Sequence, residues 1–129
     1  TDIADTTLGL EFVKKLRPVS FKWKDRVSQT LEGVVNPKDP GVRDHQGFIA
    51  QEVKKVLDSF GVDSGIHVHA NQPGSEMHDI HGLRKEELIA PLVKAIQEQD
   101  NEIQTLKSEL AAIKQTLALL VPRATVQEQ

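Results

Sequence analysis

The chain has 129 residues with a formal net charge of −3 and no cysteine, a length that suits one domain or a small domain with an extension. This charge gives no electrostatic reason to expect nucleic acid or an anionic membrane as a partner, and the missing thiols exclude disulfides and thiolate metal sites. Because no apolar stretch approaches the roughly 20 residues that span a bilayer, and no signal peptide is evident at the start, we expect a soluble protein.

Two elements are predicted near the start of the chain. Apolar residues recur at helical spacing over residues 6–16, which predicts a short amphipathic helix with Thr6 or Thr7 as its N-cap. Residues 19–24 then alternate apolar and polar side chains, as a half-buried strand does. Residues 25–44 lose this pattern and contain strong turn chemistry, so we predict a loop there.

The middle of the chain predicts a helix and a hairpin. Helical periodicity resumes over residues 47–60, and Gly61 is the expected stop. Residues 66–70 alternate again, and residues 77–80 are the predicted returning strand of a hairpin. Residues 1–84 are therefore expected to form a small globular α+β region.

A heptad repeat runs through residues 85–121. With Ile89 at position a, nine of the ten a and d positions are isoleucine or leucine. The a positions are Ile89, Ile96, Ile103, Leu110 and Leu117, and the d positions are Leu92, Gln99, Leu106, Ile113 and Leu120. Because so narrow an apolar stripe requires partner helices, we predict a coiled coil, followed by a flexible tail at residues 122–129.

The residues that flank the stripe favour a parallel trimer. Glu102 and Glu109 occupy g positions, and Lys107 and Lys114 occupy the e positions five residues later, where a parallel neighbour would place them opposite each other. We interpret isoleucine at position a with a mixture of residues at position d as favouring three or four chains over two, and a polar Gln99 in the seam can fix the register. The alternative, a helix that folds back on its own domain, does not account for the matched charges.

The histidines raise the question of a metal site. His67 and His69 would share one face of a strand, and His78 and His81 are close in sequence. Since no cysteine or well-placed acidic pair accompanies them, we interpret the first pair as polar strand positions with Val68 facing inward, and we predict no metal and no cofactor. A small metal-dependent enzyme that uses these histidines is the least favoured of three functional hypotheses.

His45 lies beside charged residues just before the second helix. There it could act as a general base or as a hydrogen-bonding anchor, and composition alone favours a structural role. The sequence contains no GxSxG motif, no glycine-rich phosphate loop and no HExxH motif. From the residues alone, no catalytic site is predicted.

Three segments, taken in order, resemble one family: LRPVSFKWK at residues 16–24, GFIAQEV at 47–53 and EELIAPLVKAIQE at 86–98. The set is similar to the C-terminal intramolecular chaperone domain of phage endosialidases, tailspikes and neck appendage proteins. The resemblance implies a homotrimer that helps an attached β-rich fibre or spike to fold in register. It also implies release by self-cleavage through a serine and a lysine base. Such a domain would act in the host-cell cytoplasm during virion assembly, or at the tip of the tail appendage.

The resemblance also assigns residues. In the family the serine and lysine stand in a Ser-Asp-x-x-x-Lys pattern, and Thr1 would lie just after this lysine, so we expect no cleavage by the chain as given. His45, Gln51 and Arg84 match positions that support assembly or cleavage. The main rival function is a plain coiled-coil oligomerisation or adaptor module without proteolysis.

Overall fold

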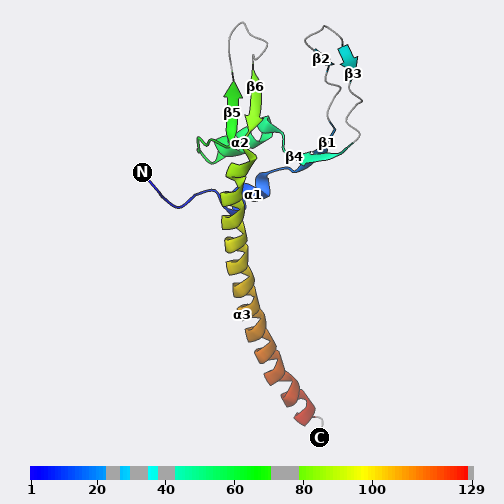
Figure 1. The fold of residues 1–129 in the computed structure, drawn as a ribbon. Helices are drawn as coiled ribbons and strands as arrows, with labels where there is room; N and C mark the ends of the chain where they lie inside the picture. Colours follow the sequence, from blue (N-terminus) through cyan, green and yellow to red (C-terminus); the bar gives the residue numbers. More distant parts are fainter. Residues whose placement is uncertain (23–26, 30–34, 38–42, 71–78, 128–129) are drawn as a thin grey trace. The chain divides into compact units, whose positions relative to one another are not determined.

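The computed structural model describes residues 1–22, 27–29, 35–37, 43–70 and 79–127, and the α+β class expected from the sequence is confirmed (Figure 1). The contacts divide the chain into two units. The strand unit is Lys14–Glu87, and the helical unit joins Thr1–Val13 to Leu88–Gln129. The residues Thr1–Val13 therefore share a unit with the long helix.

The strand unit contains three two-stranded antiparallel sheets, β1 with β4, β2 with β3, and β5 with β6. Its elements are β1 (Val19–Phe21), β2 (Val27–Gln29), β3 (Val35–Pro37), β4 (His45–Gly47), α2 (Ala50–Ser59), β5 (His67–Ala70), β6 (Ile80–Leu83) and the 3-10 turn η1 (Lys85–Leu88), which ends one residue beyond the unit.

Three predictions for this unit need correction. Residues 25–44 are not only a loop, because β2 and β3 pair within them. Residues 47–49 precede the second helix rather than begin it, and β6 starts at Ile80, the residue at which the returning strand was expected to end. Met77 and His78, and the end of the first predicted strand at 23–24, lie outside the described residues.

Helix α2 supplies much of the buried core of the strand unit. Val53 and Leu57 lie four residues apart on one helical face, and both are buried together with Ile66. The helix ends as predicted at Gly61, which has a φ of +65°. The Gly61 N–H donates to the Asp58 carbonyl and the Val62 N–H donates to the Leu57 carbonyl, which is the Schellman pattern of a left-handed helix end.

Replacing Gly61 with alanine is expected to destabilise the strand unit by about 1 kcal/mol, because a β-carbon disfavours the left-handed backbone. A side chain at this position would have no atom within 4 Å, so the cost is conformational rather than steric. Chemical denaturation of the variant measures this loss of stability. Gly61→Asn should cost less, because asparagine tolerates this conformation; equal costs for the two variants would contradict the explanation.

The helical unit consists of an N-terminal segment and the long helix α3 (Ile89–Gln127, 39 residues). Helix α1 (Leu10–Lys15) begins in this segment and runs two residues into the strand unit. It starts later than predicted, because the Thr6 hydroxyl accepts from the Leu8 N–H at 3.2 Å and closes a turn ahead of the helix. At the other end, α3 continues to Gln127 instead of ending near Val121.

The buried hydrophobic residues of the helical unit come from both of its parts. They are Leu8, Leu10, Phe12, Leu88 and Ala95. Phe12 is the most enclosed, with no exposed surface. Within the described residues, no helix combines the length and apolar character that crossing a membrane requires.

Candidate functional site

The a and d positions of α3 form an exposed apolar stripe, which we call the a/d stripe and define as the ten positions given above. Its nine isoleucine and leucine side chains are between 44% and 64% exposed. Large aliphatic side chains at this density on one helical face are unusual on a lone soluble helix. The stripe is therefore a candidate interaction surface.

The N-terminal segment lies against a different flank of α3. The Lys94 ammonium donates to the Thr6 carbonyl at 2.7 Å, and the Leu10 N–H donates to a Glu98 carboxylate oxygen at 3.1 Å. In the heptad, Lys94 and Glu98 are f and c positions, and the buried Ala95 is a g position. The chain thus covers the c, f and g side of the helix start and leaves the a/d stripe open.

Glu98 has a further role at the start of α1. Its carboxylate accepts a hydrogen bond from an N–H group that has no partner within the first helical turn, as a capping side chain does. A side chain at Gly9 would collide with this carboxylate, so glycine permits the close approach. Sequence reasoning missed this contact, since its two residues are 88 positions apart.

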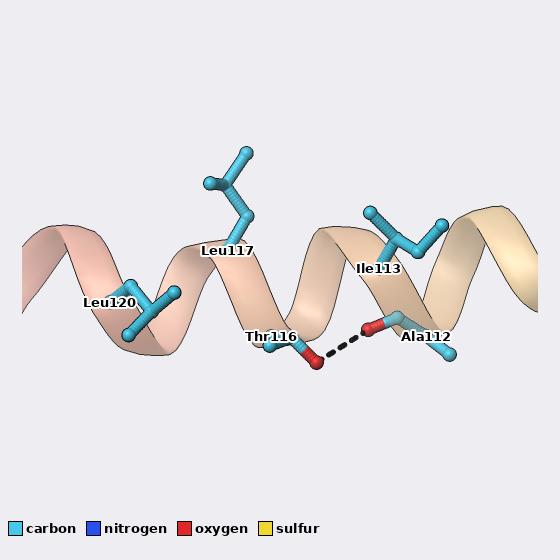
Figure 2. A pocket seen from close by; sticks show the side chains of 5 residues that line it. All are labelled: Ala112, Ile113, Thr116, Leu117 and Leu120. Atoms are coloured by element: carbon cyan, nitrogen blue, oxygen red, sulfur yellow. Dashed lines mark hydrogen bonds between the residues drawn. The ribbon is translucent and has the colours of Figure 1, made fainter.

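Beyond this region the side chains of α3 have no cover from the rest of the helical unit. Every residue from Asn101 to Val121 is exposed. Ile113, Leu117 and Leu120 line one open apolar pocket together with Ala112 and Thr116, and Figure 2 shows these five side chains on the helix. The Thr116 hydroxyl donates to the Ala112 carbonyl of its own helix at 3.1 Å, so the polar neighbour is satisfied locally (Figure 2).

The strand unit brings together two of the segments that carry the family resemblance. Val19 of β1 pairs with Gly47 of β4, and Phe21 pairs with His45. A side chain at Gly47 would meet the Phe21 ring at 3.1 Å, so glycine lets the two strands lie close. Arg17 also reaches across, donating to both carboxylate oxygens of Glu52 at 2.9 and 2.6 Å.

His45 and Gln51 lie on two different elements, and Arg84 is the residue between β6 and η1. His45 is half-buried in β4, with its ring centroid 5.7 Å from that of Phe21. Gln51 is exposed in the first turn of α2. The Arg84 N–H donates to the Ile66 carbonyl at 2.8 Å, and its guanidinium lies 3.5 Å from the carboxylate of Glu87.

The Arg17–Glu52 pair predicts a measurable pH effect. The side-chain hydrogen bond from Arg17 lowers the pKa of Glu52 below its ordinary value. A lowered folded-state pKa adds stability above the unfolded-state pKa, and this stability is lost as pH falls through the folded value. Arg17→Met should therefore raise the pKa of Glu52 in an NMR titration and cost a small amount of stability at neutral pH, with no difference in strong acid. An unchanged Glu52 pKa would contradict the assignment.

A polar cluster occupies one face of the β5–β6 hairpin. His69 Nε2 lies 2.8 Å and His81 Nε2 3.2 Å from the same Asp79 carboxylate oxygen, and His67 Nε2 lies 3.0 Å from His81 Nδ1. Burial lowers the pKa of His67, aided by the neighbouring charges of His81 and Lys54. The hydrogen bond from His69 lowers the pKa of Asp79.

The structure of the β5–β6 hairpin contradicts the prediction for Val68 and adds a partner to the predicted pair of His67 and His69. Val68 is 37% exposed, so it does not face a core as predicted. His67 and His69 share a face as expected, but the acidic partner that the sequence did not reveal is Asp79. No pattern local to Asp79 could indicate it, because the pairing of β5 with β6 determines its neighbours.

Comparison with protein families gives a match over residues 1–62 to the family described as chaperone of endosialidase. The matched part holds Arg17, His45, Gln51 and Glu52, and it ends just after α2. The resemblance stated from the sequence is confirmed over these residues. Searches of curated proteins and of solved structures gave no match.

Proposed function

We propose, from the match of residues 1–62 to the chaperone of endosialidase family and from the exposed a/d stripe, that the chain is a trimeric intramolecular chaperone. Its client is an attached β-rich fibre or spike of a phage tail. The family match supports the chaperone-type role, and the a/d stripe supports the trimer, because its apolar side chains are left exposed within the helical unit.

Burial of the stripe is sufficient to drive association. Fully burying an exposed leucine or isoleucine contributes about 1.5–3 kcal/mol. With nine such side chains about half exposed, the available stabilisation is on the order of 10 kcal/mol per chain. This is large enough to offset the loss of translational and rotational freedom on association.

The family resemblance and part of the sequence of α3 support three parallel copies as the occupants of this surface. Leucine at a with isoleucine at d, as at Leu110 and Ile113, favours trimers or tetramers, whereas isoleucine at a with leucine at d, as at Ile89 and Leu92, is typical of dimers. In a parallel in-register assembly, Glu102 of one chain meets Lys107 of its neighbour. Because such exposed pairs contribute little energy, they select orientation more than they stabilise the assembly.

A trimer formed by α3 would assist folding by holding the three attached fibre chains close together. Interleaved β-fibres fold slowly, since their contacts are distant in sequence and must form in register between chains. Linking three chains to one helical trimer raises their effective concentration and aligns their ends. Self-cleavage by a serine and a lysine preceding the matched region would then release the fibre.

Two measurements test the proposal. Sedimentation equilibrium of the chain should give three times the monomer mass, and a monomer at micromolar concentration would refute the trimer. The encoded polypeptide that contains this chain should yield native fibre when the chain is attached and aggregate when it is deleted. If fibre folds equally well without it, the rival function, a plain oligomerisation module, is supported.

His45→Ala in that longer polypeptide is expected to impair maturation. If the imidazole transfers a proton during cleavage, the rate should fall by about a hundredfold or more. Gel electrophoresis of the maturing protein measures the cleaved fraction over time, and the trimer mass of the isolated variant serves as the folding control. Normal maturation would leave His45 with a packing role beside Phe21.

A further inference from the structure

The face of the β5–β6 hairpin that bears the histidines is defined by strand geometry. Successive side chains of a strand point to opposite faces, so His67 and His69 share one face of β5. His69 is paired directly with His81 of β6, which places His81 on the same face. Asp79 precedes His81 by two residues and reaches the same side, with a φ of +58° that few L-residues other than asparagine and aspartate adopt readily.

Three donor atoms from these residues converge. One oxygen of Asp79 lies 2.8 Å from His69 Nε2 and 3.2 Å from His81 Nε2, and the ligand atoms of the set all lie within 4.8 Å of one another. Bond lengths of about 2.0–2.2 Å around a tetrahedral zinc ion place neighbouring donors roughly 3.3–3.5 Å apart. Small side-chain rotations therefore bring all three donors to coordination distance from a single ion.

His67 has the geometry of an orienting partner for one of these donors. Its Nε2 lies 3.0 Å from His81 Nδ1. If His67 accepts the Nδ1 proton of His81, the second nitrogen of His81 keeps its lone pair for a metal. A ligating histidine commonly donates its other N–H in this way, which fixes both the tautomer and the ring orientation.

We propose that His69, Asp79 and His81 bind a divalent transition-metal ion of the zinc type, with His67 as a positioning residue for His81. Two imidazoles and one carboxylate suit zinc better than calcium or magnesium, which prefer all-oxygen sites. Three protein donors leave a coordination position for water. Since the ligands come from both strands, the ion would clamp the hairpin and resist separation of β5 from β6.

The same contacts also have an explanation without a metal. A carboxylate between two imidazoles forms charge-assisted hydrogen bonds when the rings are protonated. The two explanations differ in what they require of the lone pairs: a metal needs both Nε2 atoms deprotonated, and the hydrogen bonds need them protonated.

Calorimetric titration of the chain with zinc chloride at neutral pH is the direct test. The expected result is one ion per chain and a zinc-dependent rise in the thermal midpoint. His69→Ala, Asp79→Ala and His81→Ala should each abolish measurable binding, whereas His45→Ala, a histidine change in another sheet, should leave it unaltered. Circular dichroism of each variant without zinc establishes that it is folded.

The positioning role of His67 is tested by two substitutions. His67→Phe removes the acceptor and should weaken zinc binding by about tenfold or more, within the range for outer-shell partners. His67→Gln retains an acceptor oxygen and should restore most of the affinity. Equal weakening in both variants would overturn the positioning role.

Two outcomes would overturn the metal site itself. One is the absence of saturable zinc binding by the folded chain. The other is binding that is lost equally in His45→Ala and His81→Ala, or that saturates at one ion for three chains, since either would place the ion away from the hairpin. These outcomes leave the chaperone proposal untouched, because it rests on α3 and the family match.

Discussion

Replacing Ile103 with aspartate is expected to dissociate the proposed trimer into monomers. Ile103 is an a position in the middle of the stripe, and it is 47% exposed in the single chain. In a trimer the variant would bring three carboxylates together in an apolar seam, where an unpaired buried charge costs several kcal/mol. Three such charges would remove most of the stabilisation available from the stripe. Sedimentation equilibrium at micromolar concentration measures the outcome.

A neighbouring substitution supplies the matched control. Gln104 is the next residue along α3 and lies at a b position, which faces solvent in a parallel trimer. Gln104→Asp introduces the same charge into the same helical turn, so it should retain the trimer mass. If Ile103→Asp also remained trimeric, association would have to be carried by the strand unit or the N-terminal segment, and the a/d stripe would lose its proposed role.

Replacing Phe12 with alanine is expected to cost about 3–5 kcal/mol of stability, the usual range for truncating a buried aromatic side chain. Phe12 has no exposed surface and is the largest fully buried side chain among the described residues. Native domains are stable by only about 5–15 kcal/mol, so the loss should detach α1 even where α3 remains helical. Chemical denaturation and amide hydrogen exchange over Leu10–Lys15 would report the two effects separately.

Leu119→Ala is the matched comparison for Phe12→Ala. Leu119 is 72% exposed and lies at a c position, away from the stripe. Its truncation should change stability by less than about 0.5 kcal/mol. If Leu119→Ala lowered the free energy of unfolding as much as Phe12→Ala did, the loss in Phe12→Ala could not be attributed to the burial of Phe12.

The features that the sequence predicted best are those with a strict local period. The heptad from Ile89 to Leu120 repeats without interruption, and the corresponding helix is present. Gly61 was predicted as a helix stop because one residue determines that conformation, and the Schellman hydrogen bonds are present. In both cases the information is contained within a few neighbouring residues.

The features that the sequence missed depend on distant pairing. Strands β2 and β3 have three residues each, too few to display an alternation. Glu98 reaches the start of α1 across most of the chain. Asp79 joins His69 only because β5 and β6 pair in a particular register. Family resemblance supplied His45, Gln51 and Arg84 as candidates, and their roles remain predictions.

The attachment of the N-terminal segment to α3 has a mechanical consequence. Tension applied to this segment would be borne first by the Leu10–Glu98 and Lys94–Thr6 hydrogen bonds and by the packing of Phe12. The two hydrogen bonds lie at c and f positions of α3, and the a/d stripe lies on another flank. A pull from the N-terminal side would therefore strain these hydrogen bonds before it loaded the proposed association along the stripe.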